Sequence, residues 1–335
     1  MNSRDYPKLI SVSSAATRRF PKDSIAFAHL AYANVGLQKF EEALMHANTA
    51  TALAGDQRFS YLVRGIANIG LHNYEEGIAD CSHAISLGQK HFSVYLTRSY
   101  ALASAYQYEE ALADLDQVIK IDPKNANVEL YRAYVLLGMN QFTAAHDACY
   151  RIFESVSADA LPFALFVRAL INNQLGNFDL AIADMHTAKD VMHRHEEIYI
   201  NLAYFHARKG ELKESQDNLD KLAEVENSFF KAYRDAHQAR LLLQNKQDTE
   251  ALVFSRCAAT LRPFDAFVRA THGLALLRNG ITNDAQVELD IAIQLDKYYC
   301  EANWFRGELY EKLGDEEKAK EDRKVATDYG YIPYL

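Results

Sequence analysis

The densest group of side chains that could do chemistry lies in the segment MHTAKDVMHRHEE. It holds His186, His193, His195, Glu196 and Glu197, which are residue types that bind zinc or transfer protons. Two zinc-binding histidines on one helix are typically four residues apart, and no pair here has that spacing. We therefore interpret the segment as a solvated turn between repeats, with a metal site as the weaker alternative.

The other patterns of catalytic proteins are missing from the sequence. It contains no Gly-rich loop for phosphate, no nucleophile elbow and no paired zinc-ligand motif. Cys257 and Cys300 have no partner at metal-ligand spacing. We expect a protein that is not an enzyme and that uses no cofactor and no metal.

An arginine is followed 16 residues later by an aspartate at four places: Arg64 and Asp80, Arg98 and Asp114, Arg168 and Asp184, and Arg306 and Asp322. The pattern breaks at Arg132, which is followed by Ala148, and at Glu288, which has no arginine before it. Paired charges are usually structural. We predict that each pair joins two helices; a row of arginines that binds a ligand is the alternative.

A repeat runs through the chain and explains this spacing. Nine small residues recur in the same local context at intervals of 34 or 36 residues: Ala43, Gly77, Ala111, Ala145, Ala181, Ser215, Ala251, Ala285 and Ala319. A fixed period in this range is the signature of a solenoid, in which each repeat buries its apolar face against its neighbours. The period favours a binding surface over an active site.

Each repeat has the pattern of two antiparallel helices. A second small residue lies twelve positions before the first, as at Ala31 and Gly65, and an aromatic residue such as Phe40 lies three positions before it in the first five repeats. Small residues let two helices approach closely, and the aromatic ring fills the gap beside them. Cys81 and Cys149 take equivalent positions in two second helices, so we expect buried thiols in a reducing compartment, the cytoplasm.

The sequence resembles the tetratricopeptide repeat family. The pattern is clearest in YLVRGIANIGLHNYEEGIADCSHAISLG from Tyr61 and YLTRSYALASAYQYEEALADLDQVIKIDP from Tyr95, and Pro123 and Pro263 match the family's proline after the second helix. The resemblance covers about nine-tenths of the chain. It implies an all-α, right-handed α-solenoid of about nine helix–turn–helix repeats with a half-repeat helix at the start.

The repeat boundaries predict the domain organisation. Residues 1–23 form a capping half-repeat, and 24–335 form nine repeats in one continuous solenoid, with starts near residues 24, 58, 92, 126, 162, 196, 232, 266 and 300. The formal net charge is −9 and no Lys/Arg-rich run appears, which disfavours nucleic acid as a partner. No apolar stretch approaches the ~18 residues needed to span a bilayer, so we expect no membrane insertion.

The resemblance implies that the first helices line a concave groove. Their second, fifth and ninth positions share one helical stripe, which we call the apolar stripe. In the first five repeats thirteen of its fifteen residues are apolar and none is charged. Its candidate binding residues are Tyr32, Phe59, Leu62, Ile66, Leu96, Tyr100, Leu130, Tyr134, Phe163, Phe166 and Leu170.

An apolar stripe on a surface that would otherwise be polar indicates a contact surface. The lysine, asparagine and arginine of the family's carboxylate clamp are missing from these positions. We therefore expect an adaptor that binds an apolar or aromatic segment or helix of a partner protein in the groove. The alternatives are a scaffold that associates with further copies of itself, a peptide-sensing regulator, or a stripe consumed by packing between first helices.

Overall fold

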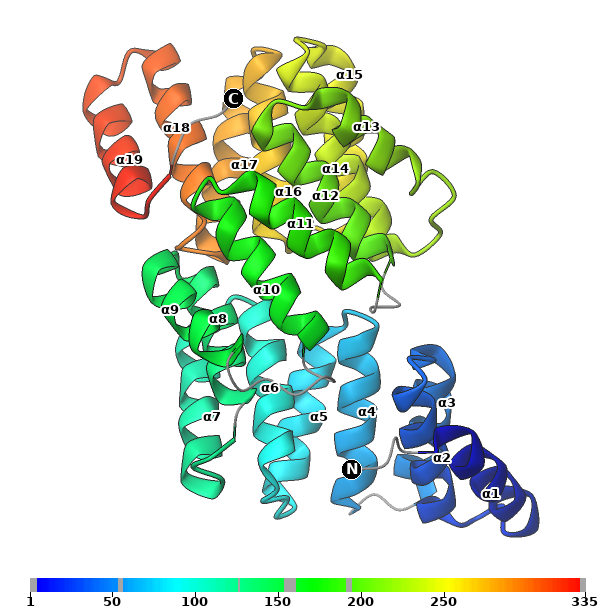
Figure 1. Cartoon of the computed structure of the whole chain (residues 1–335). Helices are drawn as coiled ribbons and strands as arrows, with labels where there is room; N and C mark the ends of the chain where they lie inside the picture. The colour runs from blue at the N-terminus through cyan, green and yellow to red at the C-terminus, as the bar shows by residue number, and fades with distance from the viewer. Residues whose placement is uncertain (1–4, 54–56, 126, 154–160, 191–194, 332–335) are drawn as a thin grey trace. The chain divides into compact units, whose positions relative to one another are not determined.

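The computed structural model describes residues 5–53, 57–125, 127–153, 161–190 and 195–331 of the chain. Within these ranges it contains 19 α-helices and no strand (Figure 1). The predicted all-α helical-repeat fold is confirmed. The helices belong to two compact units, Met1–Val135 and Leu136–Leu335.

The first unit is a stack of helix pairs preceded by a single helix. Each helix contacts the next as far as α7, and the first helices α2, α4 and α6 also contact one another. The helices are α1 (Tyr6–Arg19), α2 (Ser24–Gly36), α3 (Phe40–Leu53), α4 (Arg58–Gly70), α5 (Tyr74–Ser86), α6 (Phe92–Ser104), α7 (Tyr108–Ile121) and α8 (Asn127–Gly138), whose last turn belongs to the second unit.

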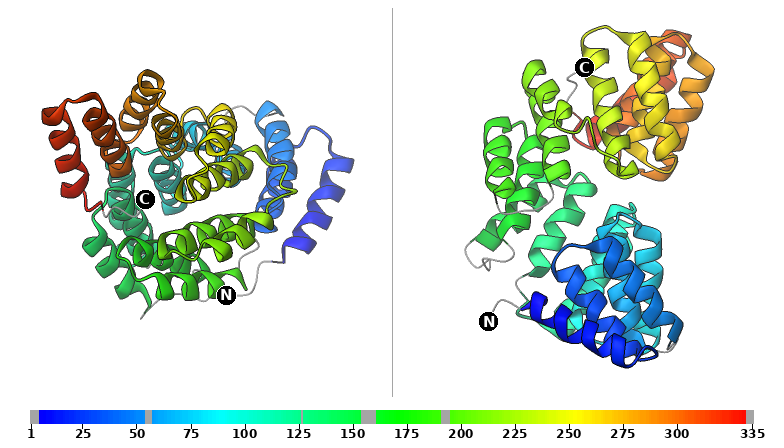
Figure 2. Two further views of the ribbon diagram at one scale, coloured as in Figure 1. Left: turned by 90° about the horizontal axis from the view of Figure 1, so that it is seen from above. Right: turned by 90° about the vertical axis from the view of Figure 1, so that its right-hand side faces the viewer.

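The second unit continues the same pairing, and its first helices α12, α14, α16 and α18 contact one another in order. Figure 2 shows the helices from residue 228 to 295, in yellow and orange, lying side by side. The helices are α9 (Phe142–Phe153), α10 (Leu161–Gln174), α11 (Phe178–Lys189), α12 (His195–Lys209), α13 (Leu212–Asp220), α14 (Ser228–Gln244), α15 (Asp248–Leu261), α16 (Ala266–Arg278), α17 (Thr282–Leu295), α18 (Cys300–Leu313) and α19 (Glu316–Asp328).

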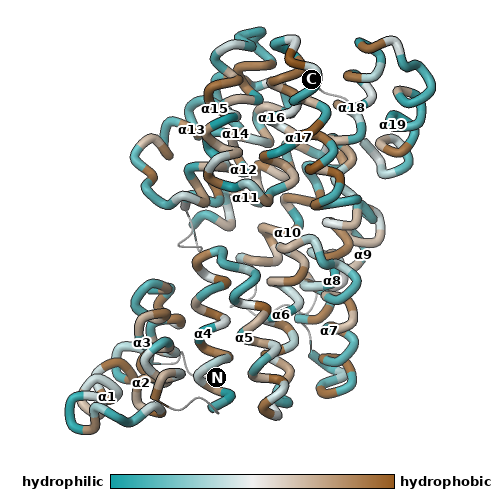
Figure 3. Tube along the Cα trace, turned by 180° about the vertical axis from the view of Figure 1, so that it is seen from behind, coloured by the Kyte–Doolittle hydropathy of each residue, from teal (hydrophilic) through white to brown (hydrophobic). Residues whose placement is uncertain are grey.

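Small residues allow the two helices of a repeat to approach closely, as the sequence predicts. A Cβ added to Gly77 would lie 2.4 Å from Ile69, and one added to Gly65 would lie 3.0 Å from the Cys81 sulfur. Ala31 and Ala43 are fully buried at the same positions of the first repeat. Apolar and polar residues alternate along the helices of both units (Figure 3), as expected for helices that bury one face.

The turn between the two helices of each repeat has one residue in the left-handed region. Glycine takes this position at Gly176, Gly210, Gly280 and Gly314, and the other five turns use Gln38, His72, Tyr106, Asn140 and Lys246. A left-handed residue after a helix allows the backbone to satisfy the last carbonyl groups and to reverse direction. The same turn therefore sets the same helix pair in every repeat.

Helix α14 begins at Ser228, before the repeat start at 232 that the spacing predicts. The side chain of Asn227 accepts hydrogen bonds from the backbone N–H of Phe229 and Phe230 at 2.9 and 3.4 Å. This cap stabilises an additional first turn. None of the helices in the described ranges is long and apolar enough to cross a bilayer.

Candidate functional site

The apolar stripe of the first unit lies on α2, α4, α6 and α8. Its second- and ninth-position side chains are half-buried, and their rings meet across neighbouring first helices. The centroids of Tyr32 and Phe59 are 5.8 Å apart, and the rings of Tyr100 and Tyr134 stack at 5.3 Å. We call Tyr32, Phe59, Ile66, Tyr100 and Tyr134 the aromatic row.

The fifth-position side chains of the same stripe are buried. Leu62 and Leu96 are each 6% exposed, and Leu130 is 1% exposed. A side chain this buried contributes packing between helices rather than contact area for a partner. These leucines therefore form the layer that supports the aromatic row.

The remaining stripe residues lie on α10 in the second unit. The rings of Phe163 and Phe166 stack with centroids 6.4 Å apart. Phe166 is 5% exposed, whereas Phe163 and Leu170 are half-buried. The fifth position is thus buried here as well, and the second and ninth positions keep some surface.

The four predicted Arg–Asp pairs are confirmed. The shortest distance between guanidinium nitrogen and carboxylate oxygen is 2.6 Å for Arg64–Asp80, 2.7 Å for Arg98–Asp114, 2.6 Å for Arg168–Asp184 and 2.7 Å for Arg306–Asp322. In the Arg98 pair the Nε and Nη2 atoms donate to separate carboxylate oxygens, which is the bidentate geometry of strong charged hydrogen bonds. These bonds raise the pKa of the Arg98 guanidinium.

The same arginines also reach the second helix of the preceding repeat. Arg98 Nη1 donates to Ser82 Oγ at 2.9 Å, and Arg306 Nη1 donates to Asp290 at 2.7 Å. Each of these side chains therefore links two consecutive second helices. The arginines have structural partners, which argues against a row that binds a ligand.

The predicted histidine cluster offers no metal site in the part of the chain that is described. His193 lies outside the described residues, as does the side chain of His195, and His186 is exposed. Elsewhere among the described residues, no three His, Cys, Asp or Glu side chains gather where they could hold a metal ion. All four thiols are free, and Cys81 and Cys149 are buried as expected.

Comparison with known proteins decides the family. The tetratricopeptide repeat family model matches residues 92–125, which hold the α6–α7 pair, and residues 301–322 in α18 and α19. The chain is a tetratricopeptide repeat protein. No curated protein matches the sequence.

Solved structures are similar to this chain in fold at low identity. The human IFIT1 dimer with m7Gppp-AAAA is 13% identical, with a TM-score of 0.60 over 92% of this chain and 72% of that chain. Yeast Tom70 is 14% identical, with a TM-score of 0.43 over 98% and 89%. A tetratricopeptide repeat protein from Parabacteroides merdae is also 14% identical, with a TM-score of 0.49 over 76% and 98%.

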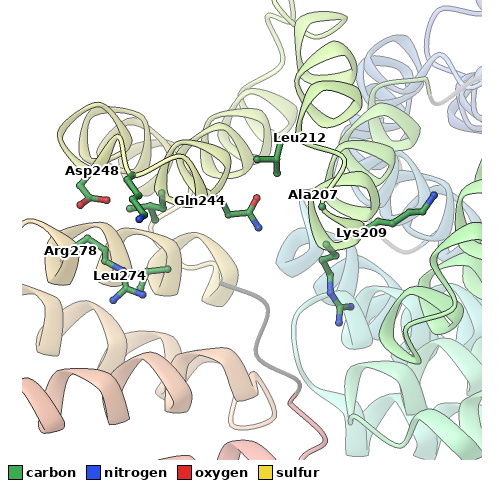
Figure 4. A pocket seen from close by; sticks show the side chains of 11 residues that line it. Ala207, Lys209, Leu212, Gln244, Asp248, Leu274 and Arg278 are labelled. Carbon is green, nitrogen blue, oxygen red and sulfur yellow. The ribbon is translucent and has the colours of Figure 1, made fainter.

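The tetratricopeptide repeats of the second unit enclose a pocket of about 620 Å³ between the ends of α12, α14 and α16 (Figure 4). Four of its side chains are basic, but salt bridges hold two of them. Lys209 pairs with Asp179 and Glu211 at 2.8 and 2.5 Å, and Arg278 pairs with Glu308 at 2.8 Å. The lining residues are Ala207, Arg208, Lys209, Gly210, Leu212, Leu243, Gln244, Lys246, Asp248, Leu274 and Arg278.

A buried ion pair joins two tetratricopeptide repeats that are not neighbours. Arg240 on α14 and Glu301 on α18 lie 2.6 Å apart, with side chains 5% and 8% exposed. Arg240 also donates to Thr271 on α16 and to the hydroxyl of Tyr299 at 3.0 Å each. The polar residues that the sequence places at later stripe positions are thus used, in this pair, to hold α14, α16 and α18 together.

The inner residues of the second unit include aromatic side chains that the sequence reasoning missed. Tyr204 and Phe267 flank His237, with ring centroids 5.3 and 4.6 Å from the imidazole. Desolvation lowers the pKa of His237 to about 3, and Arg240 acts in the same direction. The signal was present, because Tyr204 has the same repeat position as Tyr100 and Tyr134.

Proposed function

We propose that this tetratricopeptide repeat protein is a non-enzymatic adaptor that binds an apolar, partly aromatic segment of a partner protein on its first helices. The aromatic row provides the contact surface, and Leu62, Leu96 and Leu130 hold it in place from below. Phe163 and Leu170 offer a second apolar contact on α10, supported by Phe166. Repeats of this family form protein-interaction scaffolds, and the proposal assigns that role to named residues.

The observation that supports this proposal is the row of uncharged, half-buried rings on consecutive first helices of the first unit. Tyrosine is over-represented among binding hot spots because it buries a large ring and keeps a hydroxyl for hydrogen bonding. Tyr100 and Tyr134 stack at 5.3 Å, so a partner side chain would meet a rigid surface. Rigidity lowers the entropy that binding costs.

Protein is favoured over nucleic acid as the partner. The solved structures of IFIT1 hold capped RNA fragments, but RNA binding requires cations that are available to phosphates. The chain has a net charge of −9, and Arg240 and Arg278 on the first helices of the second unit are engaged by Glu301 and Glu308. The four free thiols support a reducing location, and we propose the cytoplasm.

A photo-crosslinking amino acid at position 134 tests the proposal, with a matched substitution at Ile119, an exposed residue on the second helix α7. The proposal expects position 134, and not position 119, to crosslink to a single segment of a partner protein rich in apolar and aromatic residues. Crosslinks to a second copy of the chain would favour the self-associating scaffold. Crosslinks spread over unrelated polar peptides from both positions would contradict a specific surface.

A further inference from the structure

The first and last repeats of the second unit touch. The side-chain amide of Asn140, in the turn before α9, donates to the carbonyl oxygen of Tyr298, which precedes α18. The ring of Phe142 at the start of α9 lies against Gly330, where an added Cβ would be 3.2 Å from it. The inner face between these ends is therefore bounded by the segment that follows α19.

That segment directs a tyrosine into the unit. After α19 the chain reverses at Gly330, which has a φ of +79°, and the N–H of Tyr331 donates to the carbonyl of Ala326 at 3.0 Å. Tyr331 is only 8% exposed, and its ring centroid lies 5.0 Å from that of Trp304.

The surroundings of Tyr331 combine aromatic walls with polar groups. A small pocket of about 80 Å³ is lined by Tyr331 together with Tyr204, Tyr299 and Glu301, so residues of α12 and of the α18 region meet here. Glu301 is held by the buried pair with Arg240 and accepts a hydrogen bond from the Tyr299 hydroxyl at 2.5 Å. Desolvation raises the pKa of Tyr331, and the carboxylate of Glu301 adds to the effect.

This arrangement differs from what a terminal helix requires. The last helix of a solenoid needs a polar outer face, and α19 has one, with only Ala319, Asp322 and Ala326 buried. The burial of Tyr331 lies beyond that helix and fills a site formed by other repeats. Aromatic side chains in concave, mixed aromatic and polar pockets are typical of peptide anchors.

We propose that the inner face of the second unit is a binding site for a tyrosine-containing peptide segment, and that Tyr331 occupies it in the resting chain. The tethered tyrosine blocks the site, and a peptide with the same chemistry binds by displacing it. This site is separate from the aromatic row of the first unit, so the test of either one leaves the other open.

Trp304 makes the proposal measurable because it is the single tryptophan of the chain and contacts Tyr331. We compare the full chain with a form that ends at Gly330 and with Tyr331→Ala. Both variants should show red-shifted Trp304 emission and at least twofold stronger quenching by acrylamide. Tyr150→Ala, which removes a ring that is 64% exposed, is the matched control and should leave both signals unchanged.

The probe is the acetylated hexapeptide GYIPYL, which has the sequence of residues 330–335. Adding it to the shortened chain should restore the emission of the full chain at saturation, whereas GAIPYL should not. On the full chain the apparent Kd should be at least tenfold weaker, because a tethered segment competes at an effective concentration of about millimolar.

Three results would overturn the proposal. If the shortened chain keeps the emission and quenching of the full chain, Tyr331 is not seated against Trp304. If the peptide fails to change the signal although circular dichroism shows an intact fold, Tyr331 is ordinary packing. If both variants unfold, the segment is a fixed part of the core rather than a displaceable occupant.

Discussion

Removing Arg98 should destabilise the first unit much more than removing Arg132, although the two arginines have the same repeat position. Arg98 makes two bonds to Asp114 at 2.8 and 2.7 Å and one to Ser82 at 2.9 Å. Arg132 has no aspartate 16 residues later and contacts Asp116 and Glu129 only at 3.7 and 3.8 Å. Arg98→Met and Arg132→Met therefore remove the same side chain from a strong site and a weak site.

The magnitude follows from burial. The side chain of Asp114 is 5% exposed and that of Arg98 is 22% exposed. Arg98→Met leaves a buried carboxylate without its cation, which costs about 3 kcal/mol in free energy of unfolding, at the lower end of measured buried pairs. Asp114→Asn should cost less, about 1–2 kcal/mol, because the more exposed guanidinium can still reach water and Ser82. Arg132→Met should cost less than about 1 kcal/mol.

The assay is urea unfolding followed by far-UV circular dichroism on the parent, the three single variants and the Arg98–Asp114 double variant. The double-mutant cycle should give a coupling of about 1–3 kcal/mol, since the second substitution removes the charge that the first leaves buried. Equal losses for Arg98→Met and Arg132→Met would refute the reasoning. In that case the aliphatic part of the side chain, rather than the ion pair, would stabilise this position.

Three further predictions concern the turns, the thiols and a buried imidazole. Lys246, at φ 59°, should gain up to about 1 kcal/mol of stability on substitution by glycine, whereas Gly280→Ala, at φ 77°, should lose about 1–2 kcal/mol in the same urea assay. In the native protein iodoacetamide should label exposed Cys257 quickly and Cys81 slowly, because burial raises the pKa of Cys81 to about 12; equal rates by mass spectrometry would contradict this. The pKa of His237 is about 3 in the folded chain against an ordinary value of 6.5, so its contribution to stability is complete above about pH 6.5 and is lost as the pH falls toward 3. His237→Phe should therefore begin acid unfolding at a lower pH than the parent, and an unchanged profile would exclude His237 as a cause.

Local features of the fold were predictable because each repeat solves the same packing problem. Gly65 and Gly77 mark the place where two helices must approach closely, and the interval of 16 residues between Arg64 and Asp80 follows from crossing one turn between two helices. Arg269 and Glu288 escaped prediction because this arginine lies one helical turn earlier in its repeat, so that the pair spans 19 residues. The interaction is the same, with 2.7 Å between the charged groups.

Interactions across several repeats were not predictable, because they depend on how the stacked helices curve. Arg240 and Glu301 stand two repeats apart, and the sequence indicated only that both occupy stripe positions that are apolar elsewhere. Tyr331 lies outside the repeat pattern, so no periodicity pointed to its contact with Trp304. The stripe itself was visible in the sequence, but the burial of Leu130 beneath Tyr134 required the positions of the neighbouring helices.

The aromatic row is the centre of the functional proposal, and a comparison of Tyr134→Ala with Leu130→Ala tests it most directly. Both substitutions are made on α8, one in the row and one in the buried layer below it. The binding of the crosslinked partner segment, prepared as a synthetic peptide, is measured by calorimetry, and stability by thermal unfolding.

We expect Tyr134→Ala to weaken binding by about 2 kcal/mol, or roughly thirtyfold in Kd, with little change in stability. Leu130→Ala should instead cost about 2–5 kcal/mol of stability, with binding per folded molecule retained. The opposite result, in which Tyr134→Ala collapses the fold while binding per folded molecule is unchanged, would show that the row only packs the helices together.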